Sequence, residues 1–238
     1  MIVKKIQNQH GLRAEEVPQL MLTHGVEYQK VACVNWPKEF PYAPKMEVAL
    51  AHTGDSLLLH YRVEENCIRA AAEADGGRVW EDSCCEIFLQ PSFGIENSPS
   101  QQGGVRGGSP YYNIECNCAG TLLVAKGEDR HDRQPATAKT MQSANRWSSL
   151  MKTAVSGENG RFTLPLKDGK FTWHMALVVP ATALFDSGIT DFSGLTMRGN
   201  IYKCGDCLTT PHFLSLYPID TPQPDFHRPE FFGELTFE

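Results

Sequence analysis

The chain has 238 residues, 41% of them hydrophobic and 21% charged, proportions that are typical of a globular protein with a core of its own. Its formal net charge of −6 argues against nucleic acid or an anionic membrane surface as the main partner. No apolar stretch approaches the length that is needed to cross a bilayer.

The first 30 residues contain no apolar segment followed by a cleavage site, which is what a secretory signal requires. We therefore expect a cytoplasmic protein, secreted only if a leader was removed. Its eight cysteines would then be mostly free thiols, and we interpret them as small buried hydrophobic residues. The alternative is a zinc site formed by two close pairs, Cys116 with Cys118 and Cys204 with Cys207.

Turn residues divide most of the chain into short segments with the alternating pattern of strands. Glu15–Leu22 is a candidate short helix. Lys167–Gly169 is the predicted turn of a hairpin, and Ser92–Pro110 is a predicted loop rich in Gly, Ser, Pro and Gln. The predicted strands are, in chain order, Val31–Asn35, Glu47–His52, Leu57–Val63, Cys67–Ala72, Cys85–Gln90, Tyr111–Cys118, Thr121–Lys126, Arg161–Leu166, Phe171–Val179, Leu195–Tyr202, His212–Tyr217 and Gly233–Phe237.

Many short strands with little helical pattern predict an all-β fold, and specifically a β-sandwich with short helical turns in its connections. Pro180–Phe185 is one such turn. Because no repeat and no clear linker divides the chain, we expect residues 1–238 to form a single domain.

One stretch combines a strand with an aromatic residue placed just before it. Cys85–Gln90 alternates, so that Glu86 and Phe88 share one face. Trp80 precedes this strand, at a point where a turn can leave an indole open to solvent. A polar strand face with an indole at its end is what a sugar-binding surface needs.

Two further strands repeat this division into an apolar face and a hydrogen-bonding face. Asn113 and Glu115 share one face of the strand at 111–117, and Arg198, Asn200 and Tyr202 share one face of the strand at 197–203. Amide, carboxylate and guanidinium groups suit vicinal hydroxyls, which both donate and accept hydrogen bonds. For any single strand, however, a solvated sheet face is the simpler interpretation.

These residues carry a resemblance to carbohydrate-binding module family 9, and in particular to its stand-alone bacterial members. The motifs that carry it, in order over residues 45–238, are Val79–Asp82 (VWED), Cys85–Phe88 (CEIF), Tyr111–Glu115 (YYNIE), Arg198–Asp206 (RGNIYKCGD), Pro211–Ser215 (PHFLS) and Pro224–Gly233 (PDFHRPEFFG). The resemblance implies a β-sandwich that binds mono- or oligosaccharides without catalysis. It also implies an association with xylan-degrading enzymes and polysaccharide catabolism.

The resemblance also suggests which residues would bind the sugar. The family's tryptophan and glutamate of the first motif fall on Trp80 and Glu86, polar residues of the next strand fall near Asn113 and Glu115, and the late asparagine falls on Asn200. The second family tryptophan is not matched, because Lys203 stands where we expect it. We consider Tyr202 and Trp173 as substitutes, and Arg198, Tyr202 or Lys203 as the residues that close the site.

The resemblance leaves the family's calcium sites unplaced. Calcium prefers oxygen ligands, so Asp82, Asp206 and Asp225 are candidates by residue type alone.

Two other functions remain open from the sequence. Glu86 and Glu115 could act as the acid and base of a xylanase-like glycoside hydrolase, because facing strands can hold two carboxylates about 5–10 Å apart. The same sandwich also occurs in haem-binding subunits, for which Met197, Lys203 and His212 are candidate axial ligands.

Overall fold

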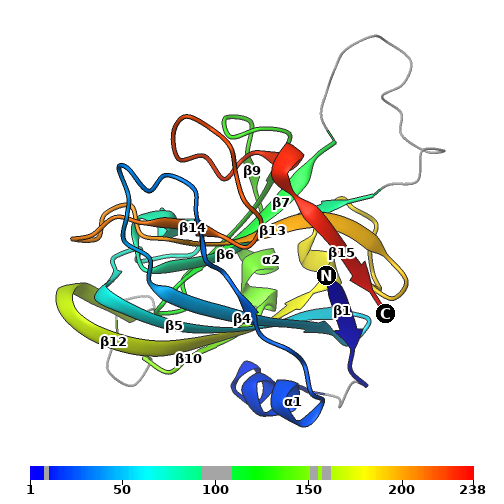
Figure 1. Ribbon diagram of the computed structural model, residues 1–238. Coiled ribbons are helices and arrows are strands. Elements are labelled where there is room, and N and C mark those ends of the chain that lie inside the picture. Colours follow the sequence, from blue (N-terminus) through cyan, green and yellow to red (C-terminus); the bar gives the residue numbers. More distant parts are fainter. Residues whose placement is uncertain (8–10, 93–108, 151–154, 157–161) are drawn as a thin grey trace.

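The computed structural model describes residues 1–7, 11–92, 109–150, 155–156 and 162–238. The predicted loop Ser92–Pro110 lies outside these residues apart from its ends. The fold is all-β, as predicted, and its strands form one strongly curled sheet whose two halves lie face to face as layers (Figure 1). No helix in the described ranges is long and apolar enough to span a membrane.

The first layer is built on the hairpin of the long strands β4 and β5, with β12 antiparallel to β5 on its other side. The strands of this layer are β2 (Gln29–Lys30), β4 (Lys45–His52), β5 (Ser56–Ala70), β10 (Asn145–Ser148), β11 (Val155–Ser156) and β12 (Phe162–Pro180).

The second layer is antiparallel and has β6 at its centre, between β13 and β7. Its strands are β3 (Cys33–Val34), β6 (Cys84–Pro91), β7 (Tyr111–Asn117), β8 (Leu122–Gly127), β9 (Gln134–Pro135), β13 (Thr196–Cys204), β14 (Phe213–Ser215) and β15 (Gly233–Phe237). Strand β1 (Ile2–Lys5) joins the layers, because it runs parallel to both β15 and β4.

In the part of the chain that the structure describes, helical structure is confined to short connections. The helices are α1 (Val17–Thr23) and α2 (Ala138–Ser143), with 3-10 turns at Ala14–Glu16, Val79–Glu81, Ala181–Ala183 and Pro229–Phe231. Val17 and Met21 of α1 pack on Ala49, Leu58 and Ala176 at the outer side of the first layer.

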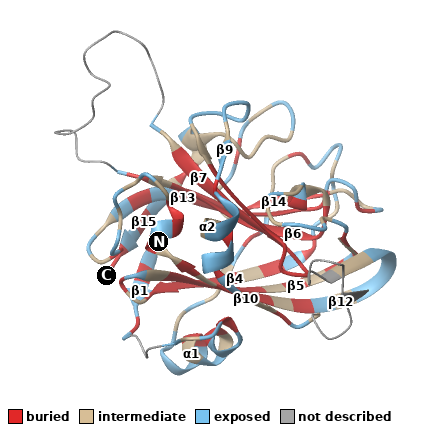
Figure 2. Ribbon diagram, turned by 180° about the vertical axis from the view of Figure 1, so that it is seen from behind, coloured by how far each residue is buried: buried red, intermediate tan, exposed pale blue. Residues whose placement is uncertain are grey.

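The apolar faces of both layers meet in the principal core. Leu57, Leu59 and Tyr61 of β5 meet Ile87 and Leu89 of β6 in one buried cluster. Figure 2 shows buried residues along β6, β7 and β13, so that the second layer is buried on both faces. This double burial requires that loops cover its outer face.

The structure corrects two strand predictions. Cys67–Ala72 is not a separate strand, because β5 continues to Ala70. The hairpin expected at Lys167–Gly169 is a single strand, β12, whose register with β5 shifts on either side of residues 167–168. A Lys-Asp-Gly sequence marks a local irregularity. Here β5 is long enough to pair with both halves of β12, so the irregularity becomes a bulge and the chain does not reverse.

Candidate functional site

The second layer carries the predicted division into two faces. Cys85, Ile87 and Leu89 of β6 point into the core between the layers. Glu86 and Phe88 point to the outer side, where they line a cavity. Strand alternation is the reason for this separation.

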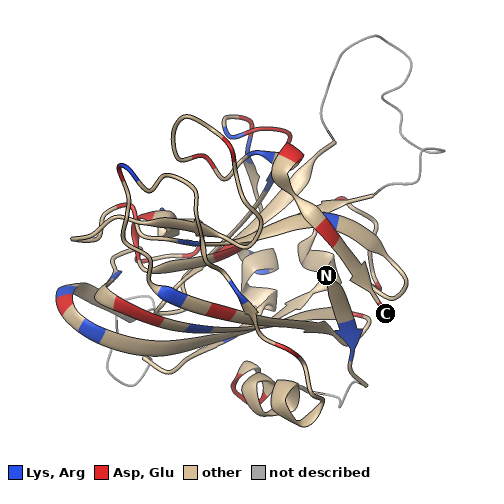
Figure 3. Cartoon of the chain, in the orientation of Figure 1, with Lys and Arg blue, Asp and Glu red and all other residues tan. Residues whose placement is uncertain are grey.

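The cavity has a volume of about 480 Å³, within the range of small-molecule sites. Its floor comes from β6, β7, β8 and β13, and its walls come from residues 76–80, 130–135 and 206–227. Figure 3 shows that the loops above this layer carry both acidic and basic residues. The lining side chains include Arg78, Trp80, Glu86, Phe88, Asn113, Leu123, Glu115, Arg130, Arg133, Cys204, Asp206, Phe213, Asp225, Phe226 and His227.

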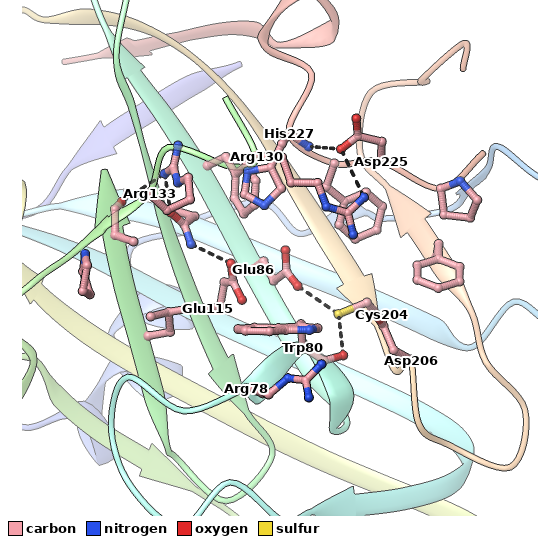
Figure 4. A pocket seen from close by; sticks show the side chains of 18 of the residues that line it. Arg78, Trp80, Glu86, Glu115, Arg130, Arg133, Cys204, Asp206, Asp225 and His227 are labelled. Carbon is pink, nitrogen blue, oxygen red and sulfur yellow. Dashed lines mark hydrogen bonds and ion pairs between the residues drawn. The ribbon is translucent and has the colours of Figure 1, made fainter. Parts of the chain in front are cut away.

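Trp80 lies at the edge of this cavity and is half-buried. It belongs to the 3-10 turn Val79–Glu81, and its carbonyl accepts a hydrogen bond of 3.2 Å from the amide of Asp206. The Arg78 guanidinium lies 5.7 Å from the centre of its ring. In Figure 4 the indole lies between Arg78 on one side and Glu86 with Glu115 on the other. The predicted open indole is therefore held in place beside two carboxylates.

Glu86 and Glu115 are direct neighbours across β6 and β7, and both are buried. Burial, together with the charge of the facing Glu115, raises the pKa of Glu86 well above its usual value. Burial likewise raises the pKa of Glu115 to about 7. The Asn113 amide donates to Glu115 Oε1 at 2.7 Å, whereas Glu115 Oε2 is buried without a hydrogen-bond partner. One carboxylate oxygen of a floor residue is thus left without a hydrogen bond from the protein.

Arg133 and His227 form the opposite wall. Arg133 donates to Asn113 Oδ1 and to the Tyr111 carbonyl, and its guanidinium lies 4.3 Å from the centre of the Tyr111 ring. The Tyr111 hydroxyl lies 2.9 Å from His227 Nδ1. Burial, reinforced by the nearby Arg133 charge, lowers the pKa of His227 to about 3, so this imidazole is neutral at pH 7. The wall therefore orients Asn113 and adds a neutral imidazole to the cavity.

Four of the eight predicted site residues line this cavity: Trp80, Glu86, Asn113 and Glu115. The other four, all on β13, do not line it. Three of these, Arg198, Asn200 and Tyr202, point to the cavity side of the sheet but are used elsewhere in the fold. Arg198 donates to the carbonyls of Glu230 and Phe232, and the Asn200 side chain bonds both the amide and the carbonyl of Tyr217.

Tyr202 and Lys203 are also occupied, on opposite faces of β13. The Tyr202 ring stacks on Phe226 with 4.2 Å between ring centres, and its hydroxyl donates to the Phe226 carbonyl. Lys203 is fully buried in the interior, where its ammonium lies 2.9 Å from a Glu65 oxygen and 2.9 Å from His212 Nε2. Alternation places Lys203 on the core face, so it cannot close the cavity.

The candidate second stacking residue and the candidate haem ligands lie in the protein interior. Trp173, considered as a second sugar-stacking residue, is buried in the core and donates to Glu65 Oε1 at 2.6 Å. Of the candidate haem ligands, Met197 is also a core residue. Both ring nitrogens of His212 have partners, Thr210 O and Lys203 Nζ. None of these side chains is available as a ligand in the cavity.

The predicted zinc ligands do not come together. Cys116 lies in the core against Met175, Cys204 lies on the opposite face of the second layer, and Cys207 is exposed. Among the calcium candidates, Asp82 is buried and accepts hydrogen bonds from the amides of residues 71 and 72. Asp206 and Asp225 line the cavity. Over the described ranges, three side chains do converge closely enough to hold a metal ion: Cys84, Glu86 and Cys204.

Several cavity residues were not identified from the sequence. Arg130 and Arg133 lie between the predicted strands Thr121–Lys126 and Arg161–Leu166, in a segment with no predicted strand. Phe213 and Phe226 supply the aromatic surface for which a second tryptophan was expected. The Pro224–Gly233 motif was the available signal for Phe226 and His227, because it placed a dense aromatic run after the last polar strand.

Comparison with known proteins was made against family models, curated sequences and solved structures. Residues 15–237 match the model of carbohydrate-binding family 9. No curated protein sequence matches significantly. A Bacteroides uniformis structure, described as that of a putative carbohydrate-binding protein, is 41% identical and superposes with a TM-score of 0.87 over 100% of this chain and 98% of that chain.

Two structures of a family 9 module from Caldicellulosiruptor kristjanssonii share the fold at a TM-score of 0.55, with 12% and 11% identity. They cover 100% of this chain and 95% and 94% of theirs, and were determined with glucose and with cellotriose. The family match extends over nearly the whole chain, and the chain therefore belongs to carbohydrate-binding family 9.

Proposed function

We propose that this protein binds a carbohydrate in the cavity of the second layer, without catalysis, and that a sugar ring stacks on Trp80. One observation carries the proposal. The cavity combines a half-buried indole with a buried carboxylate oxygen, Glu115 Oε2, that has no partner within the protein. A hydroxyl donor supplied by a ligand would satisfy this oxygen, which otherwise carries the full cost of burial.

The remaining lining supports the same ligand chemistry. A pyranose has an apolar C–H face that suits an aromatic ring and hydroxyl edges that both donate and accept. Phe226 and Phe213 add apolar surface, and Asn113 and His227 add polar groups whose orientation is held by Arg133 and Tyr111. Family membership supports it as well, because family 9 is a family of binding modules.

The test is isothermal calorimetry of the full chain with glucose, xylose, cellotriose and xylo-oligosaccharides. We expect binding of at least one of these sugars and a loss of about 10- to 100-fold in affinity in Trp80→Ala, as a stacked aromatic contact contributes roughly 1–3 kcal/mol. Trp147→Ala is the matched control, because Trp147 is also half-buried but packs beside α1, outside the cavity lining.

Glu115→Gln provides the second variant, since it removes the charge and keeps the size and the hydrogen bond with Asn113. We expect it to weaken binding, whereas Glu64→Gln on the first layer should not. The absence of heat with every sugar, or an unchanged affinity in Trp80→Ala, would refute the proposal.

A hydrolase is the second candidate, favoured by the placement of Glu86 and Glu115 directly across two strands with raised pKa values. It is distinguished by incubation of the protein with aryl glycosides and xylo-oligosaccharides. Product release that disappears in Glu86→Gln would replace the binding proposal with an enzymatic function.

A further inference from the structure

Two cysteines and a glutamate meet on the cavity floor. Cys84 of β6 pairs directly with Cys204 of β13, and Glu86 lies two residues after Cys84 on the same face. One ligand atom from each of the three lies within 4.8 Å of the other two, and Cys204 Sγ is 2.9 Å from Glu86 Oε1. Figure 4 shows the Cys204 sulfur directed toward Glu86. All three side chains are buried.

The floor side chains around this group are acidic or uncharged, and the arginines of the cavity, Arg78, Arg130 and Arg133, belong to its walls. Glu115 faces Glu86, and Asp206 lines the same cavity. Lys203, the neighbour of Cys204 in the chain, points to the opposite face and is paired with Glu65. Among the described residues, no lysine or arginine forms an ion pair with Glu86. A bound cation would supply a positive charge that no side chain of the cavity floor provides.

A second observation points to a ligand at the same place. Glu115 lines the cavity, and its Oε2 is buried without a hydrogen-bond partner. An oxygen in this position can accept a hydrogen bond from a water molecule that is held on a metal ion beside Glu86. Oriented partners of this kind are usual around metal ligands. Val79, Leu123 and Ala125 pack around the two thiols and provide the apolar shell.

We propose that Cys84, Cys204 and Glu86 form a binding site for a soft divalent cation, and that this cation is zinc. Two thiolates and one carboxylate are three protein ligands of the types zinc prefers, and the fourth position would face the cavity. Calcium and magnesium are excluded as the preferred ion, because they require oxygen ligands. Binding would release the thiol protons to solvent. This inference shares the Glu115 oxygen with the proposed carbohydrate binding, but the two are tested separately, because the metal titration is made without sugar.

The test uses the full chain, reduced with a phosphine, freed of metal and kept without sugar. Cobalt(II) serves as the spectroscopic probe and zinc as its competitor. We expect one cobalt per chain with a thiolate-to-cobalt charge-transfer band, which one equivalent of zinc abolishes. Cys84→Ala and Cys204→Ala should lose the band. Because changes around metal ligands already cost about 10–100-fold in affinity, zinc binding should weaken by at least about 100-fold in these variants.

Cys207→Ala is the matched control, because this thiol lies three residues from Cys204 but is exposed, and it should retain the band. Glu86→Gln keeps both sulfurs and should retain a weaker site, which also covers the case in which a cysteine variant fails to fold. The proposal is overturned if the folded wild-type chain gives no band, or if the band survives Cys204→Ala. It is equally overturned if Cys84 and Cys204 form a disulfide that the phosphine does not reduce.

Discussion

The buried ion pair between Lys203 and Glu65 leads to a prediction about stability. Lys203 is fully buried, and its ammonium lies 2.9 Å from the Glu65 carboxylate. Burial alone would lower the pKa of Lys203, but the Glu65 carboxylate raises it above its usual value. Lys203 is therefore charged at neutral pH, and so the pair joins β13 of one layer to β5 of the other across the core.

Replacement of Lys203 by Met keeps the volume of the aliphatic chain but leaves the Glu65 carboxylate buried without its counter-charge. Removal of one partner of a buried pair typically costs about 3–5 kcal/mol, a large part of the 5–15 kcal/mol or so by which domains are stable. We expect Lys203→Met to lower the free energy of unfolding by that amount. Adding Glu65→Gln to Lys203→Met should recover roughly 1–3 kcal/mol, because the uncompensated charge is then gone.

The assay is urea denaturation followed by far-UV circular dichroism for the wild type, both single variants and the double variant. A loss of less than about 1 kcal/mol in Lys203→Met would show that the pair does not hold the layers together. The same conclusion would follow if the losses caused by Lys203→Met and Glu65→Gln simply added up in the double variant. Calorimetry provides the control, because Lys203 faces away from the cavity and any sugar affinity should persist in every folded variant.

The remaining predictions concern the titration of buried groups and the packing around β13. Burial lowers the folded-state pKa of His60 and His227 to about 3, so the unfolded chain binds more protons between about pH 3 and 6.5. Each histidine should therefore reduce stability by up to about 1–2 kcal/mol as the pH is lowered from 7 to 5, whereas the raised pKa values of Glu86 and Glu115 act in the opposite direction. The contribution of His60 is measured as the difference between the urea midpoints of the wild type and His60→Gln at pH 7 and pH 5; a difference that does not change with pH would contradict the reasoning. Gly199→Ala should cost at least about 1–3 kcal/mol, because its Cβ would lie 2.5 Å from a backbone oxygen of β6; an unchanged melting temperature would refute this. Asn200→Ala leaves the Tyr217 amide and carbonyl without their bonds, and should lower the free energy of unfolding by roughly 1–3 kcal/mol, as thermal denaturation would measure.

Local patterns predicted most of the strands and the face of each side chain. Glu86, Asn113 and Glu115 lie on the predicted side of their strands, and Trp80 lies in a turn that leaves it half-buried. These inferences succeed because alternation is a property of each strand by itself. The hairpin predicted at Lys167–Gly169 failed because a turn signal does not reveal which strand its two flanks will pair with.

The rest of the candidate site required knowledge of which segments cover the sheet. The sequence gives no measure of how far the cavity extends along β13, so Arg198, Asn200 and Tyr202 could not be separated from the residues that line it. Arg133 and Phe226 come from connections without a periodic pattern, and only packing brings them above Glu86 and Glu115.

The sequence by itself determined an all-β architecture, its family and the polar face of each central strand. Each of these depends on strand alternation or on short motifs, which are formed by residues that are neighbours in the chain. Only the tertiary structure decided that Lys203 pairs with Glu65 in the interior and that Cys84, Cys204 and Glu86 converge. Such contacts join residues far apart in the chain, and the pairing register of the strands and the packing of the loops over them set these contacts.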